Sequence, residues 1–480
     1  MKFKFLKENI ENINNNIVVM VFKDETVNTK FSELNEVSKG FDAKYNNIEA
    51  IKMFIDGKVI NACLVGLGEK ENIDEEKVRV IGGNISRRLK NIVRDKRCEN
   101  KNVHIINVSL SSNYIGVLVE GMLLGNYEFN KYKTKQKEDQ IDTVTIFTNE
   151  YKQEDIEKAE LMAKATIIAR DLVNEPANVI YPETLANEVI NLGQQYGFEV
   201  EVYEEEKIRK FEMDAFLAVS RGSVNKPRFI VMRYFGNKGN EEILGLVGKG
   251  LTYDSGGYSI KPTDSMMDMK TDMAGAASVI GAMCAISKDK LNKNVIAVVA
   301  ACENAISGDA YKPGDIINSM GKKTIEVVNT DAEGRLTLAD AVYYIINNEK
   351  ATKVVDIATL TGAAVVALGS IATAIITNND DFYKELDDAA CMSGEKIWRM
   401  PTFDEYKKLI KGNEADLKNS GGREGGCITA GLFVGEFAGE TPWIHMDIAG
   451  SSVSNKSQGY KVKGATGEAV RTLYYLAKHK

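Results

Sequence analysis

Hydrophobic and polar positions follow two alternating patterns along the chain. Short runs rich in Val and Ile, typical of buried strands, are separated by stretches in which apolar residues recur every three or four positions, as in amphipathic helices. In the first 150 residues the expected strands are 16–22, 59–65, 103–108 and 143–147, and residues 84–101 show the main helical pattern. This rhythm predicts an α/β domain over residues 1–150.

A single long helical pattern follows this first region. Residues 154–173 place apolar side chains three or four apart, and the pattern ends at Asn174-Glu175-Pro176, where proline stops a helix. A chain of 480 residues is also too long for one ordinary core. We therefore expect a domain at 1–150, a connecting helix at 151–173 and a larger domain at 174–480.

The larger region repeats the βα rhythm, with glycine and polar residues after each apolar run. The expected strands are 243–247, 295–300, 325–328 and 354–357. Such a pattern predicts an α/β domain built on a mixed, mainly parallel sheet flanked by helices. Ligands bind such sheets at the carboxyl ends of the strands, so functional residues are expected directly after these four runs.

Composition limits the chemistry that this chain can support. Lys and Arg number 61 against 68 for Asp and Glu, and this net charge of −7 gives no overall attraction for nucleic acid. Only three histidines are present, and the six cysteines form no C-x-x-C pair, which excludes a His-rich zinc site and a dithiol site. Without a signal-type segment or a long apolar stretch, we expect a soluble cytoplasmic protein with no membrane contact.

The segment NTDAEGRL at 329–336 holds the densest set of candidate functional residues. Asp331 and Glu333 are two positions apart after an expected strand, so alternation would direct both carboxylates to one side and toward one cation. Arg335 precedes the helical pattern at 336–346, where an anion would be favoured. The alternative interpretation is a plain turn, with Asp331 as helix N-cap and Glu333 on the surface.

A second group of candidates follows the strand at 243–247. Lys249, Asp254 and Lys261 surround a Gly-Gly turn whose spacing does not match a phosphate-binding P-loop. Asp272 then precedes a helical pattern of small residues at 274–286, and its alternative interpretation is that of a helix N-cap.

The two groups together indicate a metal site. Four carboxylates on neighbouring strand ends would repel one another strongly unless divalent cations lay among them. Oxygen ligands suit Mg²⁺ or Mn²⁺, and Zn²⁺ is an alternative if the amine of Lys249 binds in its neutral form. Two such ions could activate a water molecule at neutral pH. The residues alone thus predict a two-metal hydrolase.

These segments also resemble a known family, the leucyl aminopeptidases or cytosol aminopeptidases of the M17 type. The match covers residues 171–480, and NTDAEGRL equals the family's signature octapeptide. Further matching segments are VGKGLTYDSGGYSIKP (247–262), MKTDMAGAA (269–277), DIATLTGAAVVALG (356–369) and PWIHMDIAG (442–450). Cys427 stands where the family usually has alanine, and we expect it to be a buried, inert thiol.

The resemblance implies a role for each matching residue. It implies two divalent metal ions per subunit, Mn²⁺ or Zn²⁺, with a bridging hydroxide that attacks the peptide. It implies catalytic roles for Lys261 and for Arg335, which would hold a bicarbonate ion. The implied metal ligands are Lys249, Asp254, Asp272, Asp331 and Glu333, with Asp254 and Glu333 bridging. The implied substrate-binding residues are Met269, Thr359, Leu360 and Gly362.

The resemblance further implies an exopeptidase that releases amino-terminal residues, preferably leucine or another apolar one, from short peptides with a free amino terminus. It implies a homohexamer and a macro-like amino-terminal domain. One alternative is a narrow-specificity dipeptidase. Another is a DNA-binding regulatory protein with residual peptidase activity, because Arg87, Lys90, Arg94, Arg97 and Lys101 form a basic stripe at helical spacing. A solvated helix face in an acidic protein is the favoured interpretation of that stripe, and we do not expect nucleic acid as a partner.

Overall fold

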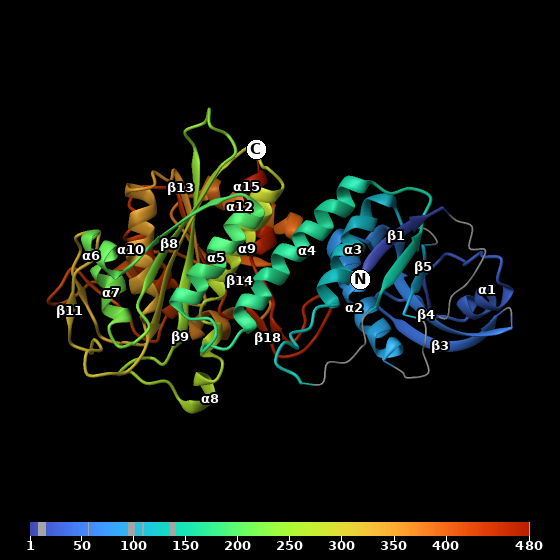
Figure 1. Ribbon diagram of the computed structural model, residues 1–480, viewed down its shortest axis with the longest axis horizontal. Coiled ribbons are helices and arrows are strands. Elements are labelled where there is room, and N and C mark those ends of the chain that lie inside the picture. Colours follow the sequence, from blue (N-terminus) through green and yellow to red (C-terminus); the bar gives the residue numbers. More distant parts are fainter. Residues whose placement is uncertain (8–15, 56, 95–100, 108–109, 135–140, 480) are drawn as a thin grey trace. The chain divides into compact units, whose positions relative to one another are not determined.

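The computed structural model describes residues 1–7, 16–55, 57–94, 101–107, 110–134 and 141–479, which divide into two compact units (Figure 1). The first unit comprises Met1–Lys164 and Lys456–Lys463, and the second comprises Ala165–Asn455 and Gly464–Lys480. The division falls inside helix α4 (Gln153–Asn174). The late segment 456–463 thus belongs to the first unit, although it follows most of the second unit in sequence.

The first unit is built on a six-stranded sheet. All neighbouring strands are parallel except the edge strand β3, which runs antiparallel to β4. In spatial order the strands are β1 (Lys2–Leu6), β6 (Thr143–Phe147), β5 (Val103–Asn107), β2 (Asn16–Phe22), β4 (Lys58–Gly68) and β3 (Ile48–Ile55). The expected strands of this region are therefore all present in one sheet.

Strand β2 shows why this unit has helices on both sheet faces. Its seven residues are all buried, and alternate side chains enter two separate cores. Val18 and Met20 pack beneath helices α2 (Glu75–Val93) and α3 (Ile115–Gly125), whereas Val19 packs in the core that contains Leu34 of α1 (Ser32–Lys39). A strand of uninterrupted apolar residues requires this three-layer arrangement.

Helix α2 departs from the expected range of 84–101. It begins at Glu75, where the side chain of Asp74 accepts a hydrogen bond from the Lys77 N–H at 2.7 Å, and it ends at Val93. Lys101 lies outside the helix, and Arg97 lies outside the described residues. The sequence prediction thus located only the second half of this helix, from Asn84 to Val93.

The second unit is built on an eight-stranded mixed sheet, in which four of the seven neighbouring pairs are parallel. The spatial order is β15 (Ile397–Arg399), β14 (Thr373–Thr377), β17 (Trp443–Asp447), β13 (Lys353–Ala358), β9 (Ile243–Asp254), β10 (Asn294–Asn304), β8 (Arg228–Phe235) and β7 (Glu199–Tyr203). The mixed, mainly parallel α/β architecture is thus confirmed.

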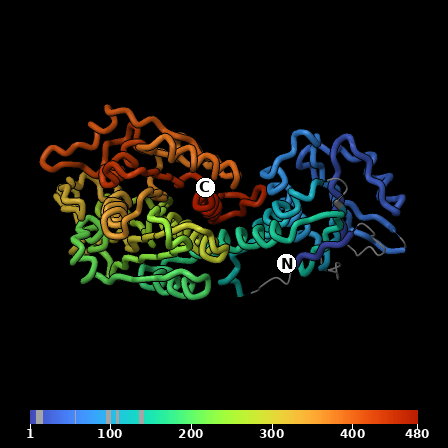
Figure 2. Tube along the Cα trace, turned by 90° about the horizontal axis from the view of Figure 1, so that it is seen from above, coloured from blue at the N-terminus to red at the C-terminus, as the bar shows by residue number. Residues whose placement is uncertain are grey.

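Helices cover both faces of this sheet. Helix α9 (Ala274–Lys288) packs between α5 (Pro182–Tyr196) and α15 (Val470–Lys478), so segments far apart in sequence lie side by side (Figures 1 and 2). On the other face, α10 (Gly334–Asn347) packs between α7 (Asp214–Ser220) and α14 (Gly426–Gly435). Alternate residues of β10, such as Val298, share the core of α7, α10 and α14.

One expected strand of the main sheet was placed wrongly. Residues 325–328 yield only β12 (Ile325–Glu326), which pairs with β11 (Ile316–Ile317) and β16 (Leu417–Lys418) in a separate three-stranded sheet. The N–H of Val328 is already bound to the side chain of Asn419 at 2.9 Å, so the chain turns before a longer ladder can form. Within the described residues, no helix is both long and apolar enough to cross a membrane.

Candidate active site

The candidate site lies where four adjacent strands of the second unit end. Strands β10, β9, β13 and β17 are parallel neighbours, so their carboxyl ends meet at one edge of the sheet. Strand β10 ends at Asn304, β9 at Asp254 and β17 at Asp447, and Thr359 follows β13 directly. Chain topology therefore brings side chains from distant parts of the sequence to one place.

Lys249 lies inside β9 and is the buried centre of this group. Its ammonium nitrogen is 2.8 Å from Oδ2 of Asp272 and 2.9 Å from Oε1 of Glu333. It also donates a hydrogen bond to the carbonyl oxygen of Thr359 at 3.0 Å. Gly334 leaves room for this side chain, because a Cβ there would lie 2.4 Å from Cε of Lys249.

Lys261 joins two other predicted residues. Its ammonium nitrogen lies 2.8 Å from Oδ2 of Asp254 and 2.6 Å from Oδ1 of Asp331. The second oxygen of Asp254 accepts hydrogen bonds from the Gly256 N–H at 2.9 Å and from the side-chain amide of Asn304 at 2.8 Å. Asp254 is thereby fixed in orientation at the end of β9.

The simpler structural interpretations of these acids are wrong. The N-cap residue of α9 is Met273 and that of α10 is Glu333, whose side chain makes no capping hydrogen bond. Asp272 instead accepts hydrogen bonds from Lys249 and from the hydroxyl of Thr359. Strand alternation was also the wrong reason to pair Asp331 with Glu333, because both lie in the turn that leads into α10.

Three of these carboxylates converge closely enough to hold a cation. Asp254, Asp272 and Glu333 are buried, and each offers an oxygen within 4.8 Å of the others. The second oxygen of Glu333, Oε2, is buried without a hydrogen-bond partner. Burying such an oxygen is unfavourable unless a cation or a donor compensates it. The donor set therefore fits a divalent ion bound by carboxylates.

Burial also changes the acidity of these groups. Removal from water, followed by repulsion from Asp254, raises the pKa of Glu333 to about 8. Burial raises the pKa of Asp272 to about 6, against the opposing effect of Lys249. Burial lowers the pKa of Lys249, but attraction to Asp272 and Glu333 outweighs burial and raises it overall. Negative charge on these carboxyl groups is therefore unfavourable unless a proton or a bound cation compensates it.

Arg335 presents a buried positive charge next to these acids. It is 8% exposed, its Nε has no hydrogen-bond partner, and no carboxylate of the described residues lies within ion-pair distance. Burial lowers the pKa of Arg335 to about 10, although nearby Glu333 and Asp447 oppose that effect. A buried guanidinium without a partner is suited to bind a small anion.

The predicted substrate-binding residues surround the same strand ends. Met269 is half-buried in a short 3-10 helix, Met269–Thr271, directly before Asp272, and Gly362 is the exposed first residue of helix α11 (Gly362–Leu368). Thr359 and Leu360 lie in the loop between β13 and α11, where the hydroxyl of Thr359 is 2.7 Å from Oδ1 of Asp272.

Sequence reasoning missed Asp447, Thr361 and Asn304 as members of this site. Asp447 accepts hydrogen bonds from the Leu360 N–H at 3.1 Å and the Thr361 hydroxyl at 2.6 Å. An acid directly after the apolar run 443–446 was the available signal. Cys427 is buried close to Arg335 and Asp447, and burial strongly raises the pKa of its thiol, as expected for an unreactive cysteine.

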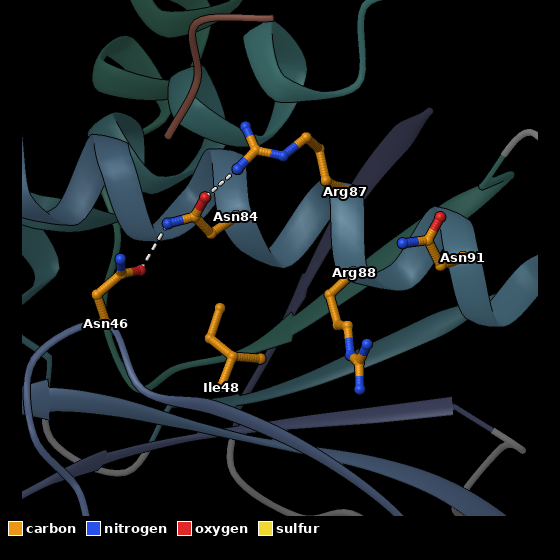
Figure 3. Close-up of a pocket in the computed structure, with 6 residues that line it drawn as sticks. All are labelled: Asn46, Ile48, Asn84, Arg87, Arg88 and Asn91. Atoms are coloured by element: carbon orange, nitrogen blue, oxygen red, sulfur yellow. Dashed lines mark hydrogen bonds between the residues drawn. The ribbon is translucent and has the colours of Figure 1, made fainter. Parts of the chain in front are cut away.

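The first unit contains a separate hollow of about 450 Å³, shown in Figure 3. It lies between α2 and the start of β3, and its lining comprises Asn46, Ile48, Asn84, Arg87, Arg88 and Asn91. Amides and guanidinium groups dominate this lining, and none of these side chains is an acid or a nucleophile. The hollow therefore lacks the groups needed for hydrolytic chemistry.

The basic stripe on α2 is largely engaged within the first unit. Arg87 donates to the side chain of Asn84 and to the carbonyl oxygen of Gly459. Arg94 pairs with Glu128 at 2.6 Å, and the buried Lys90 lies 3.5 Å from the same carboxylate. Arg87, Lys90 and Arg94 are therefore paired within the first unit rather than fully solvated.

Comparisons with known proteins identify the family of this chain. Residues 167–474 match the family model described as "cytosol aminopeptidase family, catalytic domain". Residues 18–136 match the model of the N-terminal domain of the same family. A "probable cytosol aminopeptidase" of Clostridium perfringens is 52% identical, with 95% of this chain and 94% of the relative covered. One from Clostridium tetani is 46% identical, with 96% of each chain covered.

Solved structures show the same relationship. The bottromycin maturation enzyme BotP, in complex with Mn, superimposes with a TM-score of 0.86 at 29% identity, covering 97% of this chain and 99% of BotP. The match extends over both units, so the predicted family, the fold class and the assignment as an enzyme are confirmed. The chain belongs to the cytosol aminopeptidase family, M17, and is a peptidase.

Proposed function

We propose that this aminopeptidase is a metal-dependent exopeptidase that releases leucine or other apolar residues from the amino terminus of short peptides. The observation that carries the proposal is the convergence of three buried carboxylates, with the unpartnered Oε2 of Glu333 among them. Close packing of such carboxylates is unfavourable unless protons or a bound cation compensate their charge. Its position at the carboxyl edge of the sheet is also the usual place for a substrate.

In this proposal two divalent ions, Mn²⁺ or Zn²⁺, bind per subunit. Lys249, Asp254, Asp272 and Glu333 would hold one ion, and Asp254, Asp331 and Glu333 would hold the other. When bound, the ions lower the pKa of a water molecule and polarise the scissile carbonyl group. The structure of BotP was solved in complex with Mn, which supports an ion of this class.

The protein's own residues then have separate tasks. Lys249 must lose its proton to bind a metal ion, because an ammonium group has no free electron pair. Lys261, held by Asp254 and Asp331, is placed to stabilise negative charge that develops on the carbonyl oxygen. Arg335 would hold a bicarbonate ion, for which its buried and unpartnered Nε is suited.

Substrate binding would involve the residues around the loop after β13. Met269, Thr359 and Gly362 would line the pocket for the first side chain, and the backbone at Leu360 would receive the peptide chain. A free amino terminus would be required because it contributes a ligand to the metal centre. We further propose a cytoplasmic location, in line with the relatives' name "cytosol aminopeptidase". The family resemblance also leads us to propose a homohexamer.

The test is hydrolysis of leucine p-nitroanilide by metal-stripped protein to which Mn²⁺ or Zn²⁺ is returned. We expect activity only after metal is restored, and none on the substrate with a blocked amino group. Turnover in the presence of excess chelator would contradict metal dependence. Hydrolysis of dipeptides alone would identify the narrow-specificity alternative instead.

A further inference from the structure

Asp447 is buried at the end of β17 and binds the loop that follows β13. It is 1% exposed, and its Oδ1 accepts hydrogen bonds from the N–H groups of Leu360 and Ala449, both at 3.1 Å. Its Oδ2 accepts the hydroxyl of Thr361 at 2.6 Å. The oxygen of this hydroxyl accepts the Ala364 N–H at 3.0 Å, so Asp447 also fixes the start of helix α11.

The other end of the same loop is fixed by the proposed metal ligands. The carbonyl oxygen of Thr359 accepts the ammonium group of Lys249, and its hydroxyl donates to Asp272. Among the described residues, Asp447 is the side chain that binds the backbone of Leu360. Because the Leu360 N–H already binds Asp447, only the backbone carbonyl oxygen of Leu360 remains available to a ligand.

Other buried polar residues support the position of Asp447. Trp443, His445 and Asp447 alternate along β17 and therefore project from the same face of the sheet. Trp443 donates its indole N–H to Asp356 at 2.6 Å, and Nδ1 of His445 lies 2.5 Å from the same carboxyl group. The buried guanidinium of Arg335 interacts electrostatically with Asp447 and offsets the burial of its negative charge.

We infer that Asp447 is a positioning residue for catalysis, which aligns the Thr359–Thr361 backbone with the metal centre for peptide binding. This inference rests on the proposed function. A loop displaced by about 1 Å at such a site can reduce the rate about 100-fold. The metal ligands do not depend on Asp447 directly, so the loss should occur with the metal content unchanged.

The test compares Asp447→Ala and Asp447→Asn in the Mn²⁺-loaded, full-length enzyme. Asp340→Ala and Asp340→Asn serve as matched controls, because buried Asp340 also accepts two backbone N–H groups, from Phe216 at 2.9 Å and Met320 at 2.8 Å. The measurements are kcat and KM on leucyl-leucine, bound Mn²⁺ per subunit and Tm.

We expect Asp447→Ala to keep its Mn²⁺, raise KM and lower kcat/KM by about 100-fold. Asp447→Asn should recover most of kcat/KM, since its amide oxygen can still accept the N–H groups of Leu360 and Ala449. The Asp340 variants should lose Tm without a change in KM. Should Asp447→Ala not fold, Thr361→Val, which removes one of the three hydrogen bonds, should still raise KM.

A wild-type KM in Asp447→Ala would overturn the inference, as would an equal rise in KM in the Asp340 controls. If Asp447→Ala does not fold, an unchanged KM in Thr361→Val would overturn it. Loss of Mn²⁺ from Asp447→Ala would also overturn it, because the residue would then act through the metal. Wild-type enzyme that shows no metal-dependent turnover would instead contradict the proposed function, and with it this inference.

Discussion

Glu333 shows how one residue gains its role from its surroundings. The sequence contains 68 acidic residues, most of which are expected on the surface, and nothing else in the composition distinguishes Glu333 from them. In the structure it is 1% exposed, its Oε1 lies 2.9 Å from Lys249, and its Oε2 has no hydrogen-bond partner. This combination of burial and incomplete pairing supports its proposed role as a ligand for a cation.

We predict that Glu333→Ala abolishes metal-dependent hydrolysis while the subunit stays folded. The change removes the proposed bridging oxygens and leaves Lys249 with Asp272. Metal content measured by mass spectrometry should fall together with activity. Lys261→Ala serves as the comparison, since it should lower kcat with both ions retained. Wild-type turnover in Glu333→Ala would refute the assignment.

Asp340, on α10, illustrates a buried carboxyl group outside the proposed centre. It is fully buried, and burial raises its pKa from 3.8 to about 7, despite the opposing hydrogen bonds from the Phe216 and Met320 N–H groups. The folded state therefore binds this proton more tightly than the unfolded state does. The stabilisation that comes from this tighter proton binding is fully present below about pH 4, the pKa of an unfolded aspartate. It is lost as the pH rises to about 7, the pKa of Asp340 in the folded protein.

We accordingly predict that wild-type protein loses stability relative to Asp340→Asn between pH 4 and pH 7. The variant has no carboxyl group to titrate at this position, so the difference isolates Asp340. The measurement is the Tm of both proteins across this range. A Tm difference that stays constant, or that changes in favour of the wild type at higher pH, would contradict the prediction.

At the scale of elements, glycine lets helix α9 pack directly on the sheet. Gly275 lies in the first turn of α9, and a Cβ there would be 2.0 Å from the carbonyl oxygen of Ile357 in β13. The same Cβ would be 3.0 Å from the N atom of Lys249. The helix that follows Asp272 is thus held at a distance that only glycine permits.

Gly275→Ala is expected to destabilise the second unit by about 1–3 kcal/mol, a range typical of overpacked interiors. Because α9 must move away from β9 and β13, Asp272 should shift with it and metal affinity should fall. The measurements are Tm and titration with Mn²⁺. Gly308→Ala is the control, since a Cβ at Gly308 meets nothing within 4 Å. Equal Tm values for the two variants would contradict this account.

At the scale of the whole molecule, the chain forms two units that share helix α4. Each has its own sheet and its own cores, and the residues of the proposed centre all belong to the second unit. Catalysis therefore does not require residues of the first unit within the centre itself.

We predict that the protein forms a homohexamer in solution. Sedimentation equilibrium should then give about six times the subunit mass of 53.0 kDa. The measurement is best made with and without Mn²⁺, so that any dependence of assembly on metal is visible. A mass equal to one or two subunits under both conditions would exclude the hexamer.

The sequence by itself predicted the strands from their apolar runs and identified the family from its motifs. Strand β2 matched its expected range because six consecutive apolar residues, rich in Val, follow Asn16, and such a run is typical of a strand buried on both faces. The octapeptide around Asp331 and Glu333 identified the family because its combination of acids, glycine and arginine is highly specific. Local sequence is sufficient for both kinds of inference.

Only the tertiary structure decided how these residues meet. Residues 325–328 looked like a core strand but pair in a small separate sheet, and the N-cap roles considered for Asp272 and Asp331 are not realised. Asp447 was missed because its partners, Leu360 and Thr361, are 86 or 87 residues away in sequence. The periodicity of apolar residues indicates burial and local conformation. Hydrogen bonding between distant strand ends depends instead on the order of the strands in the sheet. No short segment of sequence specifies that order.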